Sequence, residues 1–134
     1  MKPIIAIDPG REKCGIALAD KMQGALWKKV IATNNLSQTI QMLLKEYDAD
    51  RIVMGDGTTS KSAKMKIQAD FPMIPLHMVD EYRTTDEAKI RYWKENKPHG
   101  WKRLIPTTML VPPVPVDDYV AVILAECYFC VKNK

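Results

Sequence analysis

The sequence predicts an α/β fold: a mixed five-stranded sheet, three antiparallel strands and then two parallel ones, with helices on both faces. Near the N-terminus, three apolar segments of strand length follow one another with short connections, which is typical of an antiparallel meander. Strand-like and helix-like segments then alternate, which implies parallel pairing and helices on both faces of the sheet. A length of 134 residues suits one core, so we expect residues 1–134 to form one domain.

The meander is predicted from "KPIIAID" (2–8), "CGIALAD" (14–20) and "ALWKKVIAT" (25–33), with Gly24 in the turn between the last two. The first segment is apolar throughout, so we expect a strand that is buried on both faces. A helix follows, because apolar residues recur at helical spacing and make one stripe. The stripe consists of Leu36, Ile40, Leu43, Leu44 and Tyr47, with Asn35 as the expected N-cap.

The second half predicts strand, helix, strand, helix and helix. The strands are "RIVMG" (51–55) and "PLHMVD" (75–80), and between them we expect a basic helix over 59–70 whose inner face is Ala63 and Ile67. Thr84 and Glu87 have the spacing of a capping box and predict a helix through about Lys94. The proline-rich residues 96–116 predict a long loop, and "DDYVAVILAECYF" (117–129) predicts a final helix that is buried nearly all round.

Composition narrows the class of protein. The net charge of +4 and the pI of about 8.9 permit a nucleic-acid partner without requiring one. No apolar run is long enough to span a membrane, and no signal peptide is recognisable, so we expect a cytoplasmic protein. Three cysteines in such a context predict reduced thiols. For the Cys127–Cys130 pair, simple burial is favoured over a redox or zinc site, because a helix C-terminus disfavours a thiolate.

The segment "GDGTTSKS", Gly55 to Ser62, resembles a phosphate-binding P-loop but misses it by one residue. Ser60 stands where the motif needs the glycine that lets the backbone curl before the lysine. A P-loop NTPase that uses Lys61 is therefore an alternative, and a phosphate site at the N-terminus of a helix is the favoured interpretation.

Carboxylates occupy three places where ligand sites gather in open sheets: the ends of strands and the start of a helix. Asp8 ends the first strand, Glu81 follows the fifth, and Asp117 with Asp118 begins the last helix. Carboxylates that are forced together repel one another, and hard ions such as Mg²⁺ relieve the repulsion. Two such ions can activate a water and stabilise the leaving oxygen of a phosphodiester. Taken alone, each acid also has a structural interpretation as a turn, cap or surface residue.

Together these stretches resemble a known family. "IIAIDPGREKCGIALAD" is similar to the opening of the RuvC-like resolvases and the YqgF-type proteins, in which Asp8 would be the acid and Gly10 and Gly15 the turn glycines. "VDEYRTTDEA" resembles the second signature, with the acid at Glu81, and "PVDDYVAVILAECYF" resembles the closing helix, with Asp117 as the best match and Asp118 as its rival.

The resemblance implies an RNase H-like fold and cleavage of phosphodiester bonds that depends on one or two Mg²⁺ or Mn²⁺ ions, held by Asp8, Glu81 and Asp117. The family's roles are processing of the 5′ end of the pre-16S ribosomal RNA and, by kinship, resolution of Holliday junctions, so the partner is structured RNA or branched DNA. The chain departs from RuvC at Val120 or Ala121, where RuvC has a further acid, and Tyr82 stands where an arginine usually follows the second acid. A module of the same fold that binds nucleic acid without cleaving it is an alternative.

Basic residues close to the three acids are candidates for phosphate contacts. Trp101 on the long loop combines a stacking ring with two neighbouring cations, which suits unpaired bases. The other interpretation is a solvated basic face with a tryptophan packed under a loop. The candidates are Arg11, Lys13, Lys61, Lys64, Lys66, Arg83, Trp101, Lys102 and Arg103.

Overall fold

A computed structural model describes residues 2–57, 60–79, 88, 92, 94–95 and 117–132. Its centre is a five-stranded sheet in the order β3-β2-β1-β4-β5. β1 pairs antiparallel with β2 and parallel with β4, β2 pairs antiparallel with β3, and β4 pairs parallel with β5. The predicted fold class is therefore confirmed. The strands are β1 (Ile4–Asp8), β2 (Lys13–Asp20), β3 (Gly24–Ala32), β4 (Ile52–Gly55) and β5 (Leu76–Val79).

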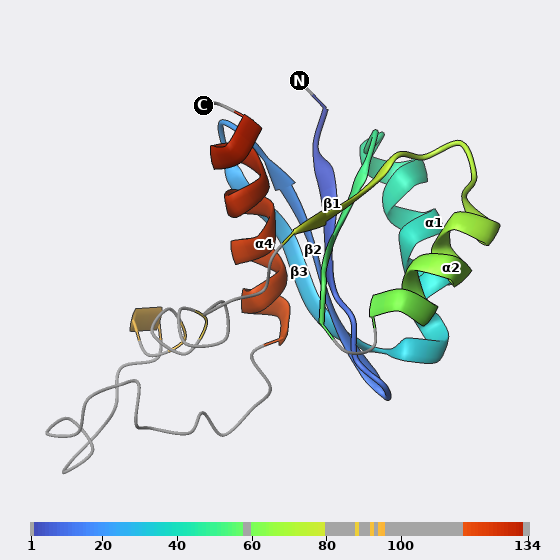
Figure 1. The fold of residues 1–134 in the computed structure, drawn as a ribbon. Coiled ribbons are helices and arrows are strands. Elements are labelled where there is room, and N and C mark those ends of the chain that lie inside the picture. The colour runs from blue at the N-terminus through green and yellow to red at the C-terminus, as the bar shows by residue number, and fades with distance from the viewer. Residues whose placement is uncertain are drawn as a thin grey trace, which may run out of the picture.

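The described helices cover both faces of the sheet (Figure 1). α4 lies against one face, and α1 and α2 lie side by side against the other. The helices are the short 3-10 turn η1 (Thr33–Asn35), α1 (Leu36–Tyr47), α2 (Ser60–Asp70) and α4 (Asp117–Lys132). Of the helix predicted around 84–94, the structure describes Ala88, Tyr92 and Lys94, which are helical, and the loop predicted over 96–116 lies outside the described residues.

Alternation along the strands divides the buried residues into two cores. Ile5 and Ile7 of β1 belong to the core under α1 and α2, together with the large side chains of β2 and β4. Ile4 and Ala6 of β1 face α4. The sheet surface under α4 is made largely of small residues, including Ala6, Ala17 and Ala19, which lets a helix that is apolar nearly all round lie close to the strands.

α4 is as buried as its sequence predicts, since every residue from Tyr119 to Ala125 is buried. In α1, Leu36, Ile40 and Leu43 are buried as expected, whereas Tyr47 is 39% exposed at the end of the helix. Asn35 does hold the N-cap position, but its side chain makes no capping hydrogen bond; the helix starts through η1 instead. The predicted inner face of α2 is confirmed, with Ile67 buried and Ala63 partly buried against the same core.

Candidate active site at the carboxyl end of the sheet

Asp8 is the last residue of the central strand and is half-buried. It lies two residues beyond Ala6 in β1, so its side chain points to the face of the sheet that α4 covers. In β2 its register partner is Gly15. In β4, Gly55 lies one step beyond the Ile7–Met54 pair and shares its face with Val53. Asp8 therefore stands between two glycines of the neighbouring strands.

The turn after Asp8 is closely packed. A Cβ on Gly10 would lie 2.1 Å from the backbone oxygen of Lys13, so only glycine fits there without a backbone shift. Thr33 Oγ1 donates to the Gly10 oxygen at 3.0 Å, and Cys14 Sγ lies 3.2 Å from the same hydroxyl. Arg11 on this turn and Lys13 at the start of β2 are exposed. The contacts hold two cations next to the end of β1.

α4 begins at the same end of the sheet (Figure 1). Its first residue is Asp117, and at its far end Tyr128 contacts Arg51, which immediately precedes β4. The helix therefore runs opposite to β1 and β4, and its N-terminus lies at the carboxyl end of these strands. The favourable field of a helix N-terminus towards negative charge suits a carboxylate at this position.

Asp118 is engaged in a different direction. Its Oδ2 lies 3.5 Å from Lys28 Nζ on β3, and its Oδ1 accepts a hydrogen bond from the Tyr119 N–H at 3.0 Å. β3 is the edge strand two places from β1, on the side away from β4 and β5. Asp118 thus belongs to an ion pair with the β3 edge. Sequence reasoning missed Lys28, because nothing in the alternating pattern of β3 distinguishes it from Lys29.

The remaining acid of the predicted triad lies outside the described residues. β5 is described as far as Val79, which pairs with Gly55, and Glu81 comes two residues later in the sequence. Within the described part of the chain, no group of three His, Cys, Asp or Glu side chains is able to hold a metal ion. Glu81, Arg83, Trp101, Lys102 and Arg103 are all among the residues that the structure does not describe.

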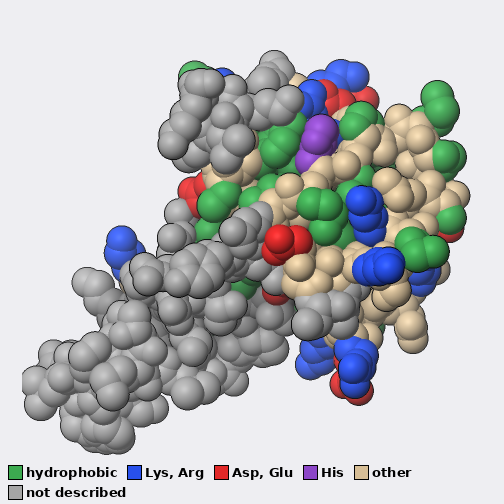
Figure 2. Space-filling view, in the orientation of Figure 1, with side chains coloured by type: hydrophobic (Ala, Val, Ile, Leu, Met, Phe, Trp, Pro, Cys, Tyr) green, Lys and Arg blue, Asp and Glu red, His purple; other side chains and the backbone are tan. Residues whose placement is uncertain are grey.

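The lysines of α2 lie at different distances from the carboxyl end of the sheet. α2 begins at Ser60, soon after β4 ends, and Lys61 is exposed in its first turn. Lys64 is half-buried, and exposed Lys66 lies about 9 Å further along the helix axis than Ser60 at a rise of about 1.5 Å per residue. Because α2 begins soon after β4 ends, Lys61 is the lysine of this helix that lies nearest the carboxyl end of the sheet. In Figure 2, blue side chains also gather at the lower end of the described part, where β1 ends.

The segment that resembles a P-loop closes on itself. Ser60 is buried, its Oγ donates to the Gly57 oxygen at 2.6 Å, and its N–H donates to the same oxygen at 3.0 Å. The serine that replaces the motif's glycine therefore caps a turn before α2. Moreover, the sheet begins with an antiparallel meander, whereas a P-loop domain normally opens with its phosphate loop.

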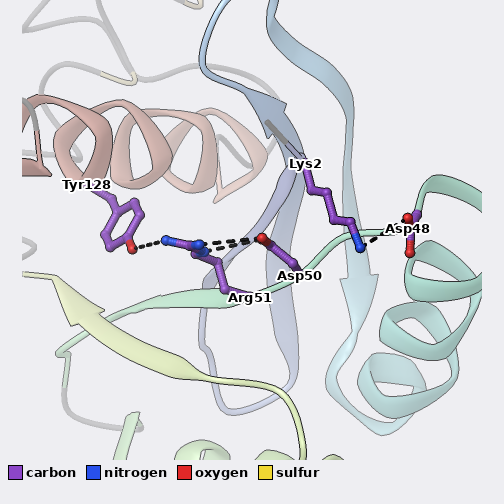
Figure 3. Close-up of polar contacts among 5 residues, drawn as sticks. All are labelled: Lys2, Asp48, Asp50, Arg51 and Tyr128. Atoms are coloured by element: carbon purple, nitrogen blue, oxygen red, sulfur yellow. Dashed lines mark hydrogen bonds and ion pairs between the residues drawn. The ribbon is translucent and has the colours of Figure 1, made fainter.

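A second polar cluster lies at the opposite end of the sheet (Figure 3). Arg51 donates to the Tyr128 hydroxyl at 2.8 Å and to Asp50 at 3.2 Å. These hydrogen bonds, with that to Tyr128 the larger effect and that to Asp50 the second, raise the pKa of Arg51 above its ordinary value. Lys2 Nζ lies 3.3 Å from Asp48, which follows α1 in the left-handed conformation. This cluster fastens the C-terminal half of α4 and stands far from Asp8.

Comparison with known proteins decides the family. The family model described as "RuvX: Holliday junction resolvase" matches residues 2–104, which is more than half of the chain. The chain belongs to the RuvX family. The matched range includes Asp8, the glycines beside it and Glu81, but it ends before α4. A comparison with curated proteins finds no match.

Two solved structures of Thermus thermophilus RuvC extend the RuvX likeness to the rest of the chain. The one described as the RuvC structure has 13% identity and a TM-score of 0.62, and covers 98% of this chain and 96% of that chain. The other, RuvC in complex with a Holliday junction substrate, has 12% identity and a TM-score of 0.66, with 99% and 96% covered. At such identities the likeness shows the fold, which is RNase H-like and includes α4.

Membership of the RuvX family identifies the chain as a nuclease, a hydrolase of the resolvase type, and neither the P-loop NTPase nor the non-catalytic module is favoured. Resolvase nucleases generally depend on divalent metal ions. No helix among the described residues is long and apolar enough to cross a membrane.

Proposed function

We propose that this RuvX protein is a divalent-metal-dependent endonuclease that cleaves phosphodiester bonds in branched DNA, with Asp8, Glu81 and Asp117 as its metal ligands. The observation that carries the proposal is the place of Asp8. Its carboxylate stands at the end of the central strand, on the face covered by α4, between Gly15 and Gly55. The first turn of α4 lies at the same end of the sheet.

The donor chemistry fits Mg²⁺ or Mn²⁺. The three proposed ligands are carboxylates, and hard cations of this size prefer oxygen. One or two such ions would be held by Asp8 at the carboxyl end of the sheet, together with Glu81 and Asp117. When bound, such ions supply a water of lowered pKa and neutralise the charge on the leaving oxygen. Asp8 lies at the end of a strand and Asp117 at the start of a helix, and such elements hold metal ligands more rigidly than loops do.

Asp117 is favoured over Asp118 as the third ligand. Successive residues of a helix point about 100° apart, since a turn contains about 3.6 residues. Asp117 and Asp118 therefore do not point in the same direction. Asp118 is occupied by Lys28 on the β3 side. Glu81, by contrast, would come from the β5 side, because β5 lies beyond β4 as seen from β1.

Basic residues around this edge would bind the phosphates on either side of the cleaved bond. Arg11 is exposed on the turn after Asp8, Lys13 at the start of β2, and Lys61 at the start of α2. Such contacts position a nucleic acid without reading its sequence. Lys64 and Lys66 would serve phosphates further from the cleaved bond. Arg83 and the Trp101–Arg103 segment would add contacts to the junction, the tryptophan by stacking on an unpaired base.

The proposal is tested with purified protein, a labelled four-way DNA junction, linear duplex and structured RNA, each with and without Mn²⁺. We expect Mn²⁺-dependent cleavage of the junction. Asp8→Asn, Glu81→Gln and Asp117→Asn should each reduce it by more than about a hundredfold, since loss of even an indirect partner of a metal ligand costs about ten- to a hundredfold. The matched control is Asp48→Asn, an exposed acid at the other end of the molecule whose left-handed backbone suits asparagine.

Two outcomes would contradict the proposal. Junction cleavage that persists in Asp8→Asn would remove the acid centre from the mechanism. Cleavage of the structured RNA while the junction stays intact would retain the nuclease and its acids but assign them to RNA processing.

A further inference from the structure

Lys28 connects the edge of the sheet to the first turn of α4. It lies on β3 opposite Ala17 of β2, and Ala17 belongs to the core that faces α4. The Lys28 side chain, one-third exposed, reaches across this face to Asp118, with 3.5 Å between Nζ and Oδ2. Its ammonium group also lies 4.3 Å from the centre of the Tyr119 ring. One cation therefore contacts two consecutive residues of the helix start.

Tyr119 is held from another side as well. The ring is buried, and its hydroxyl donates to Glu95 Oε2 at 2.5 Å. Tyr92 packs against the ring edge-to-face, with 6.1 Å between the ring centres. The first turn of α4 is thus held between β3 on one side and Tyr92 and Glu95 on the other. Helix ends fray unless their groups find partners, so these contacts fix the turn that begins with Asp117.

We propose that Lys28 is a positioning residue of the nuclease centre: by holding Asp118 and Tyr119 against β3, it fixes the first turn of α4, the turn that carries Asp117. The inference rests on the proposed function, in which Asp117 is a metal ligand. It also gives Asp118 a role, because the pair that Asp118 forms with Lys28 sets the rotation of the helix start.

If Lys28 acted only through its charge, its removal would change the affinity for the metal ion in the opposite direction. A lysine that acted only through its positive charge would repel a divalent ion nearby, so its removal would tighten metal binding. A lysine that positions a ligand stabilises the metal-binding geometry, so its removal weakens binding. The direction of the change therefore separates the two roles.

The experiment compares Lys28→Met, Lys28→Arg and Lys29→Met with the unmodified protein. Lys29 is the neighbouring exposed lysine on the opposite face of β3, so its methionine variant removes the same charge without touching α4. Mn²⁺ binding is measured by calorimetry without nucleic acid, and the Mn²⁺ concentration for half-maximal junction cleavage is measured separately. We expect Lys28→Met to raise the Mn²⁺ dissociation constant and the Mn²⁺ concentration for half-maximal cleavage about tenfold each. This is the lower end of the loss seen for partners of metal ligands. In Lys28→Arg and in Lys29→Met, both quantities should stay at the values of the unmodified protein.

Unchanged or tighter Mn²⁺ binding in Lys28→Met would overturn the inference, as would an equal loss in Lys29→Met. If Lys28→Met does not fold, Lys28→Gln takes its place under the same criteria. Asp117→Asn distinguishes the two levels of the proposal. If Asp117→Asn binds Mn²⁺ normally, the proposed ligand set fails. If Asp117→Asn loses Mn²⁺ binding while Lys28→Met binds Mn²⁺ normally, the ligand set stands and only the role of Lys28 fails.

Discussion

Replacing Gly10 by alanine should damage both the stability and the activity of the protein. The new Cβ would lie 2.1 Å from the backbone oxygen of Lys13, whereas ordinary contacts begin at 3.4 Å, so one of the two backbone segments must move by about 1.3 Å, the difference of these distances. Neither partner is a flexible side chain that could rotate away. A shift of this size also strains the hydrogen bond from Thr33 to the Gly10 oxygen.

Forced repacking of this kind costs about 2 kcal/mol of the free energy of unfolding. For a chain of this length, that corresponds to a fall in melting temperature of roughly 8 °C. Junction cleavage should fall as well, because the same turn follows Asp8, carries Arg11 and leads into Lys13. Thermal unfolding and cleavage rate are measured on the same preparation, at a temperature where the variant is folded.

Gly24→Ala is the matched control. Gly24 has a φ of +80°, but a Cβ there would have no atom within 4 Å, so alanine brings strain without a clash. Its cost should be about 1–2 kcal/mol from the left-handed backbone alone, with the cleavage rate unchanged. If Gly10→Ala behaves like Gly24→Ala or like the unmodified protein, the close approach at Gly10 does not govern the site.

Three further substitutions test the packing and the polar cluster. Leu43→Ala empties a fully buried position under α1 and should cost about 3 kcal/mol in chemical denaturation. Ala17→Leu overfills the small-residue surface under α4; it should cost about 2 kcal/mol and reduce cleavage by displacing the helix, and an intact cleavage rate would show that α4 tolerates the shift. Arg51→Met removes the hydrogen bonds to Tyr128 and Asp50 and should cost about 1–2 kcal/mol, with cleavage retained because the cluster is remote. The pKa of Arg51 is raised in the folded state. Its contribution to the free energy of unfolding is therefore fully present below the pKa of the unfolded state, and it is lost only as the pH rises through the pKa of the folded state. Denaturation curves across the neutral range should show no pH dependence from this residue.

The sheet was predictable because its pattern is simple: continuous apolar runs for the central strands and helical spacing for Leu36, Ile40 and Leu43. The face to which Asp8 points also follows from alternation once β1 is known to be covered on both sides. The two glycines beside Asp8 become apparent only from the strand order, which places the partly exposed Asp8 between Gly15 and Gly55. No local pattern in the sequence reveals which strands become neighbours.

The contacts that orient α4 could not be derived from the sequence. Lys28 and Lys29 are adjacent and chemically identical, and only the packing of α4 over one face of β3 makes the first a partner of Asp118. Asn35 holds the predicted N-cap position, but its side chain makes no capping hydrogen bond, and its backbone oxygen accepts from Thr39 Oγ1. The Lys28–Asp118 pair joins residues that are far apart in the sequence and that only the fold brings together.

The position of α4 has a consequence for the order in which the protein matures. Asp8 lies in the first strand of the chain, whereas the helix that begins with Asp117 is the last element described, and it packs across β1, β2, β3 and β4. A growing chain could assemble the sheet with α1 and α2 while this helix is still being synthesised. With the ligands as proposed, such a chain would not yet cut nucleic acid, so the enzyme would become active only when its final helix docks.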